Sequence, residues 1–299
     1  MGTPDFSVPT LEALIQAGHS IVGVYCQPDK QKGRGKQVQM PPVKVAALEH
    51  DLPVYQPVTL RDEQVRAELE ALQPDVVIVI AYGKILPPWL IRLPQYGCIN
   101  VHASILPSYR GAAPIHYAIL NGDSKTGVTI MHMDDGLDTG DIIDIVPVLT
   151  RWVNGEIVAT PQDDSMATHT TKITKEMGQI DWSKPANEIA NLIRGLNPAP
   201  GCYTYLDGKR LKVWSGEVVP SDTTHCLIDV HGKHVPIAIS ATTVPGTIVS
   251  KIDGLGVFCG DGNIILLTEV QPENKKRISA IDFINGHQIK EGIVFGDSI

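Results

Sequence analysis

The 299-residue sequence is short of the features that would place it in a membrane or outside the cell. No apolar run approaches the roughly 18 residues that span a bilayer, and no signal peptide opens the chain. The cysteines are few, lie far apart and form no C-x-x-C pair; they are Cys26, Cys98, Cys202, Cys226 and Cys259. This spacing argues against structural zinc and for a reducing compartment, so we expect a cytoplasmic protein without bound metal or membrane contact.

An excess of positive charge is also missing. The formal net charge of −8 argues against a chain-wide basic face for nucleic acid, but it leaves room for local patches. Basic residues gather without an acidic one in the segment 30–48, at Lys30, Lys32, Arg34, Lys36 and Lys44. A second basic cluster is Lys275-Lys276-Arg277. Patches of this kind can bind phosphates even on an acidic protein.

The length is sufficient for two domains with sizeable cores. Patterns typical of helices occur at 10–17, 43–50, 64–72 and 112–120, and patterns typical of strands at 21–26, 76–81, 98–102 and 128–131. This alternation predicts an α/β domain with a Rossmann-like parallel sheet. The segment 30–40 is too irregular for either element, so we expect a loop there.

The pattern changes near residue 200. A helix over 187–196 and a hinge at 198–201 lead into short strands separated by turns, which predict a small antiparallel β-barrel closed by a helix over 278–286. We therefore predict a first domain over 1–182, a linker helix and hinge over 183–200, and a second domain over 201–299.

The segment 97–141 carries the most chemistry. Asn100 and His102 lie two residues apart in a short apolar strand, so they face the same side. An acidic loop that contains Asp138 follows the next strand, and ligands of open parallel sheets bind at such strand ends. An amide, an imidazole and a carboxylate at one sheet edge suit acyl transfer to an amine. Asn100 can hold an oxygen that becomes negative, His102 can move protons, and Asp138 can orient His102.

Simpler interpretations of these residues stay open. An Asn or a His at the end of a strand is more often a hydrogen-bonded structural residue than a catalytic one. An Asp-rich loop with glycines is usually a solvated turn and sometimes a cation site.

The motif N-x-H-x-S-x-L-P-x-x-R-G over 100–111, followed by M-D-x-G-x-D-T-G-D over 133–141, resembles the signature of the formyltransferases that use 10-formyltetrahydrofolate. The resemblance covers nearly the whole chain. Further motifs are similar to the branch that acts on a charged tRNA: Gly2-Thr3-Pro4-Asp5-Phe6, Gln27-Pro28-Asp29, Gly33-Arg34-Gly35-Lys36, Pro42-Val43-Lys44 and Ala81-Tyr82-Gly83.

This resemblance implies formyl transfer from 10-formyltetrahydrofolate, as co-substrate, to the α-amino group of methionyl initiator tRNA. It implies that Asn100, His102 and Asp138 are catalytic and that the second domain is an OB-like barrel. The implied folate-binding residues are Ser104, Ile105, Leu106, Pro107, Ile85, Leu86, Met133 and Asp135. The implied tRNA-binding residues are Arg34, Lys32 and Lys36, in a mobile loop. We expect a monomer that uses no metal.

Two departures from the family pattern stand out. The apolar strand that opens most family members is missing before Gly2, and a helix expected after Leu149 is absent. The alternatives are a formyltransferase for an amino-sugar nucleotide and an inactive homologue that binds tRNA or folate. Glycinamide-ribonucleotide formyltransferases share only the first domain.

Overall fold

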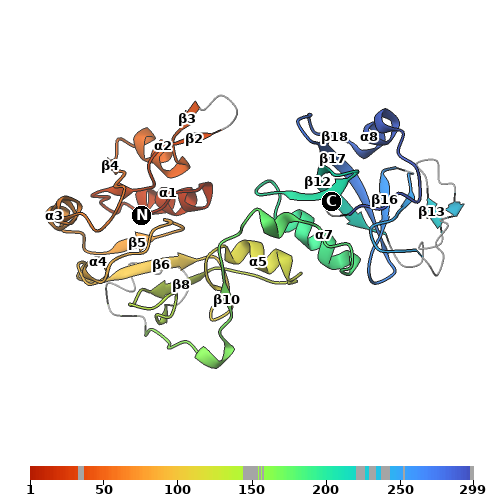
Figure 1. Cartoon of the computed structure of the whole chain (residues 1–299). Helices are drawn as coiled ribbons and strands as arrows, with labels where there is room; N and C mark the ends of the chain where they lie inside the picture. Colours follow the sequence, from red (N-terminus) through yellow and green to blue (C-terminus); the bar gives the residue numbers. More distant parts are fainter. Residues whose placement is uncertain are drawn as a thin grey trace. The chain divides into compact units, whose positions relative to one another are not determined.

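The computed structural model describes residues 1–32, 37–143, 154, 156, 158–219, 226–228, 234–236, 243–251 and 253–296. These residues form two compact units (Figure 1). The first comprises Met1–Gly111 and Gly127–His169, and the second comprises Ala112–Thr126 and Thr170–Ile299. The segment 144–153, where the sequence lacks the helix of the family pattern, lies outside the described residues.

The first unit contains a two-stranded parallel sheet and a four-stranded sheet that begins with a parallel pair of strands. β1 (Val24–Tyr25) pairs with β4 (Val54–Tyr55), and β5 (Val77–Val79) pairs with β6 (Cys98–His102), both in parallel register. The parallel sheet predicted from the alternating pattern is thus confirmed. β8 (Thr129–His132) and β9 (Ile142–Ile143) continue the sheet beyond β6 in antiparallel register.

Helices lie between the strands in sequence, as the apolar periodicity predicts. They are α1 (Val8–Gln16), α2 (Pro42–Glu49), α3 (Glu63–Leu72) and α4 (Pro88–Ile91), with short 3₁₀ turns η1 (Asp5–Ser7) and η2 (Asp164–Met166). Prolines begin α1, α2 and α4, where no backbone donor is needed. The Asp62 side chain caps α3 by accepting from the Gln64 amide. Leu11 of α1 packs with β1, and Leu69 of α3 packs with β5.

The segment 30–40 corrects the sequence prediction of a loop. β2 (Lys30–Lys32) and β3 (Gln37–Gln39) form an antiparallel hairpin in which Lys30 pairs with Gln39. The side chains of β3 are exposed, and backbone pairing alone defines this ribbon, so the hydrophobic pattern gave no signal for it.

Met1 and Gly2 lie between β1 and β5, where the family's opening strand is expected. The Gly2 amide donates to the Tyr25 carbonyl (2.9 Å), Gly2 forms a parallel bridge with Ile80, and the Met1 α-amino group donates to the Ile78 carbonyl (2.7 Å). A cavity of about 500 Å³ lies beside them, and much of its lining is apolar, including Leu11, Val24, Leu69, Val77 and Ile80. The sheet therefore exposes apolar side chains to this cavity.

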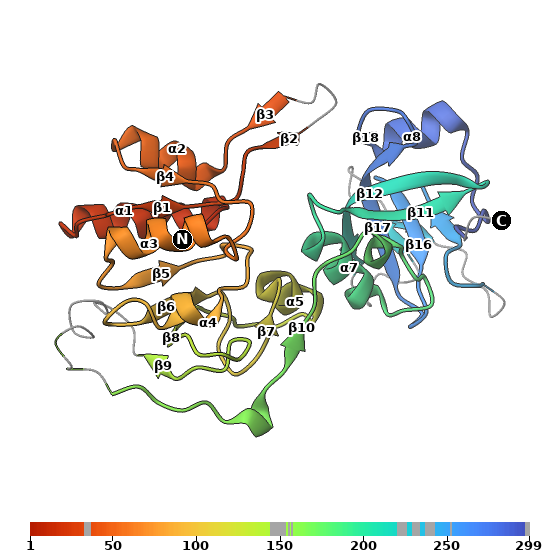
Figure 2. The same ribbon diagram turned by 60° about the vertical axis from the view of Figure 1, so that its left-hand side comes forward.

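The second unit contains a curled antiparallel sheet (Figure 2). Its strands are β11 (Cys202–Leu206), β12 (Lys209–Val218), β17 (Ile264–Pro272), β16 (Leu255–Phe258) and β15 (Ile248–Ser250) in spatial order, with β18 (Ile278–Ser279) beside β17. β13 (Cys226–Ile228) and β14 (His234–Pro236) form a separate hairpin. This antiparallel architecture confirms the predicted class of the second domain.

Helices complete the second unit. α5 (Pro114–Leu120), α7 (Ala186–Gly195) and α8 (Ala280–His287) belong to it, with η3 (Glu176–Gly178). Ile189 and Ile193 of α7 are almost fully buried against Val213 and Leu267 of the sheet. At that burial each aliphatic side chain contributes about 1.5–3 kcal/mol of transfer free energy.

The short strands β7 (Arg110–Gly111) and β10 (His169–Thr170) lie near the unit boundaries. In the described part of the chain, no helix has the length and apolar character needed to cross a membrane.

Candidate active site

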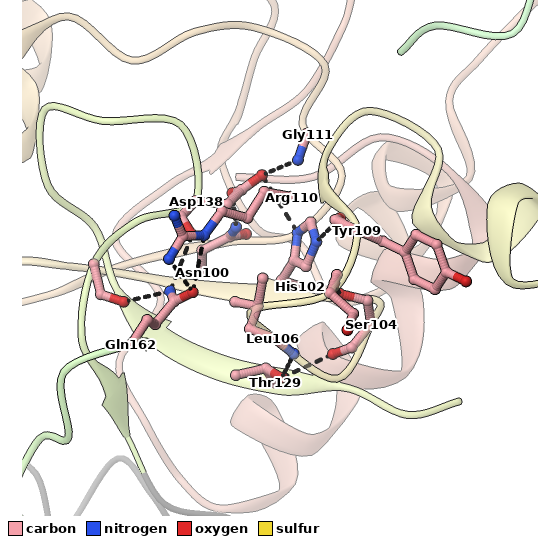
Figure 3. A network of polar contacts seen from close by, with 12 residues as sticks. Asn100, His102, Ser104, Leu106, Tyr109, Arg110, Gly111, Thr129, Asp138 and Gln162 are labelled. Atoms are coloured by element: carbon pink, nitrogen blue, oxygen red, sulfur yellow. Dashed lines mark hydrogen bonds and ion pairs between the residues drawn. The ribbon is translucent and has the colours of Figure 1, made fainter. Parts of the chain in front are cut away.

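Asn100, His102 and Asp138 meet at the end of β6, as the sequence predicted (Figure 3). The Asn100 amide nitrogen Nδ2 donates to Asp138 Oδ1 at 3.2 Å, and His102 Nδ1 lies 3.7 Å from Asp138 Oδ2. Asn100 and His102 are 9% and 6% exposed. The two-residue repeat of β6 places both side chains on one face, and the loop after β8 brings the carboxylate to them.

The carboxylate of Asp138 is held from several directions. Gly111 donates its backbone amide to Oδ2 at 2.8 Å. The Asp138 backbone has a φ of 53°, a left-handed conformation that Asp tolerates better than most residues. A Cβ atom at Gly140 would lie 1.8 Å from the His132 carbonyl oxygen, so only glycine allows the loop to approach β8 this closely.

The imidazole of His102 faces an oxygen on each side. Its Nε2 lies 2.9 Å from the Tyr109 carbonyl oxygen, which can only accept a hydrogen bond, so Nε2 carries the proton. Its Nδ1 faces the Asp138 carboxylate. The ring therefore lies between two oxygen atoms that fix its orientation.

Arg110 and Gln162 extend this cluster and were not among the site residues predicted from the sequence. Gln162 donates from Nε2 to the carbonyl oxygens of Asp138 (3.0 Å) and Gly140 (2.7 Å). Its Oε1 accepts from Nε and Nη2 of Arg110 at 3.0 and 2.8 Å. The Arg110 side chain is 3% exposed. Arg110 stands in the recognised motif, but Gln162 lies outside it and at no diagnostic spacing, so no sequence signal pointed to it.

The predicted folate segment 104–107 forms an ordered turn beside the cluster. Ser104 is fully buried, and its hydroxyl donates to the Ser108 carbonyl at 2.6 Å. Thr129 ties the turn to β8, because its Oγ1 donates to the Ser104 carbonyl (2.7 Å) and accepts from the Leu106 amide (3.0 Å). Leu106 is buried, Ile105 is half-exposed, and the Pro107 carbonyl accepts from the Thr168 amide. Thr129 was another residue that the sequence analysis did not identify.

The other predicted folate residues are more dispersed. Ile85 is 91% exposed, whereas Leu86 is buried in the core and Met133 packs against the same core. Asp135 forms an exposed ion pair with Arg92. Among the described residues, these four take no part in the polar contacts that join Asn100, His102 and Asp138.

The predicted tRNA residues cannot be placed as a group. Arg34 and Lys36 lie outside the described residues, and only the backbone of Lys32, at the end of β2, is described.

The buried thiols are poor candidates for nucleophiles. Burial raises the pKa of Cys98, which begins β6, to about 12, and burial is also the main cause of the same shift at Cys202 and Cys259. A thiol with such a pKa stays protonated near neutral pH. In the described ranges, no group of three or more His, Cys, Asp or Glu side chains is arranged to hold a metal ion. None of Asn100, His102 and Asp138 lines the cavity beside Met1.

Comparison with known proteins assigns the class. The family model "Formyl transferase" matches residues 1–154, and "Formyl transferase, C-terminal domain" matches residues 172–288. The fold and the polar cluster at β6 therefore belong to an enzyme of the formyl transferase class.

Curated relatives narrow the class. The chain is 43% identical to the methionyl-tRNA formyltransferase of Alkaliphilus oremlandii, over 99% of this chain and 98% of that protein. It is 41% identical to the enzyme of the same name from Bacillus subtilis, over 99% and 96%. This chain belongs to the methionyl-tRNA formyltransferase family. Both alignments span 323 positions against 299 residues here, so the relatives contain residues that this chain lacks.

Solved structures share the fold at low identity. WlaRD, a sugar 3N-formyl transferase solved in the presence of dTDP and 5-N-formyl-THF, superposes with a TM-score of 0.58 at 18% identity, covering 92% of this chain and 97% of that one. The N-formyltransferase from Helicobacter canadensis, in complex with folinic acid and dTDP-3-aminofucose, gives 0.57 at 17% identity, covering 91% and 97%.

Proposed function

We propose that this chain transfers the formyl group of 10-formyltetrahydrofolate to the α-amino group of methionyl initiator tRNA. The observation that carries the proposal is the polar cluster of Asn100, His102 and Asp138 at β6, in a chain of the methionyl-tRNA formyltransferase family. In this cluster Asn100 donates a hydrogen bond to Asp138, and His102 Nδ1 lies 3.7 Å from the same carboxylate. The folate derivatives in the two solved structures support a formyl-folate donor.

The chemistry follows from the geometry. The amine nitrogen attacks the formyl carbon, and the resulting tetrahedral centre carries a negative oxygen. Asn100 donates one amide hydrogen to Asp138 and has a second for this oxygen. Collapse of the centre breaks the bond from carbon to N10 of the folate. The amine loses a proton and N10 gains one, so the products are the formylated amine and tetrahydrofolate.

His102 and Asp138 manage charge and protons in this scheme. His102 stabilises the developing negative charge and assists proton movement, while Asp138 orients the imidazole and a water molecule. The segment 104–107, with Ile85, Leu86, Met133 and Asp135, contributes to the folate site. Arg34, Lys32 and Lys36 contact tRNA phosphates. We expect a cytoplasmic monomer that requires no metal.

The experiment that tests the function compares acceptors under identical conditions. Purified enzyme is given 10-formyltetrahydrofolate with charged methionyl initiator tRNA, with methionyl elongator tRNA, or with a dTDP-amino sugar. We expect formylation of the initiator tRNA alone. Formylation of the amino sugar would favour the alternative enzyme, and folate or tRNA binding without any product would favour an inactive homologue.

A further inference from the structure

One amide group holds the main chain of the loop that carries Asp138. The two hydrogens on Gln162 Nε2 go to the carbonyl oxygens of Asp138 (3.0 Å) and Gly140 (2.7 Å), which flank Thr139 (Figure 3). The left-handed backbone at Asp138 is less stable than an ordinary conformation and depends on its surroundings. Gln162 supplies two hydrogen bonds at this point of the loop.

The orientation of the Gln162 amide is itself fixed. Its oxygen accepts from Nε and Nη2 of Arg110, and a guanidinium can only donate, so the amide cannot flip without facing donor to donor. Arg110 is almost completely buried, and its Nη2 also pairs with Asp164 at 2.7 Å. The next residue, Gly111, donates to the Asp138 carboxylate. The segment 110–111 thus contacts Asp138 both directly and through Gln162.

We propose that Gln162 is a positioning residue for formyl transfer, which holds the Asp138 loop through its main chain so that the carboxylate stays aligned with His102 and Asn100. This inference rests on the proposed function for its kinetic consequence. Gln162 makes no hydrogen bond to the three catalytic side chains themselves among the described residues, so its effect passes through the loop backbone.

Two substitutions distinguish the hydrogen bonds that Gln162 donates to the loop from the one acceptor that it offers to Arg110. Gln162→Ala removes both hydrogen bonds to the loop and the acceptor for Arg110. Gln162→Glu keeps the size and the acceptor for Arg110, but it replaces the donors to the two carbonyl oxygens by a charged carboxylate oxygen. Gln16→Ala, at an exposed glutamine on α1 of the same unit, is the matched control.

The kinetic expectation is a fall in kcat with little change in KM. A displacement of the order of 1 Å in a catalytic group costs about 100-fold in rate, so we expect kcat to fall by about 10- to 100-fold for both Gln162 variants. KM for folate and for tRNA should stay within about twofold, because in this proposal Gln162 acts on the Asp138 loop and not on a substrate. Gln16→Ala should match the wild type.

Hydrogen exchange provides a readout that does not depend on activity. In Gln162→Glu and Gln162→Ala, backbone amides of residues 134–141 should exchange faster, while amides of β5 and β6 keep their wild-type rates. Wild-type kcat in both variants, in an enzyme that formylates methionyl-tRNA, would overturn the positioning role. If the wild type lacks that activity, the proposed function fails. Even then, unchanged hydrogen exchange of residues 134–141 in both variants would show that Gln162 does not hold the Asp138 loop.

Discussion

Asn100 and Asp138 lie 38 residues apart in sequence and are joined by a hydrogen bond of 3.2 Å between Nδ2 and Oδ1. The bond connects the middle of β6 to the loop after β8, the strand that pairs with β6. It leaves Oδ2 of the carboxylate for Gly111 and His102. The two carboxylate oxygens therefore have different partners: Oδ1 contacts Asn100, and Oδ2 contacts Gly111 and His102.

Replacing Asp138 with asparagine should slow formyl transfer. The amide that takes the place of the carboxylate has one acceptor oxygen instead of two, so it cannot satisfy both the Asn100 amide and the Gly111 backbone. It also removes the negative charge beside His102. We expect a loss of about 100-fold or more in kcat, measured by quench flow with both substrates saturating. Wild-type kcat in this variant would remove Asp138 from the mechanism.

Thr129 offers a test of the buried turn at 104–107. Thr129→Val removes the hydroxyl that joins the Ser104 carbonyl to the Leu106 amide and leaves two buried polar groups unpaired. Such groups cost about 1–3 kcal/mol each, so the free energy of unfolding should fall by about 2–6 kcal/mol in urea titrations. Thr129→Ser keeps the hydroxyl and should retain most of the stability. Equal stability of the valine variant and the wild type would contradict this account of the turn.

Arg34 tests the proposed contact with tRNA. A guanidinium binds phosphates bidentately, so Arg34→Ala should lower kcat/KM for tRNA by about tenfold and leave KM for folate unchanged. Lys125→Ala, at an exposed lysine elsewhere, is the control. The loss should shrink at high ionic strength, where phosphate contacts contribute less. An unchanged kcat/KM for tRNA at two ionic strengths would exclude Arg34 from the tRNA site.

Periodic apolar patterns were the best guide to the fold. The helix predicted over 64–72 is α3 (Glu63–Leu72), and the buried run at 76–81 contains β5 (Val77–Val79). The strand predicted over 21–26 is shorter in the structure, because its partner β4 spans only Val54–Tyr55 and pairs with Val24–Tyr25. The β2–β3 hairpin is polar and was missed for lack of an apolar face.

The candidate site was also predicted only in part. The two-residue repeat of a strand predicts that Asn100 and His102 share a face, and the position of Asp138 after the next strand predicts that it lies near them. Gln162 and Thr129 act through backbone carbonyls and amides, and such contacts leave no residue pattern in a single sequence. Three-dimensional coordinates were needed to find them.

The central claim is that the cluster of Asn100, His102 and Asp138 carries formyl transfer, and single-turnover kinetics of His102→Ala test it most directly. Enzyme in excess over methionyl initiator tRNA, with saturating 10-formyltetrahydrofolate, isolates the chemical step. A positioned acid–base group contributes about 10²–10⁴-fold, so the single-turnover rate should fall by that factor while folate affinity, measured separately by fluorescence titration, stays within about twofold. A single-turnover rate equal to that of the wild type would contradict the account.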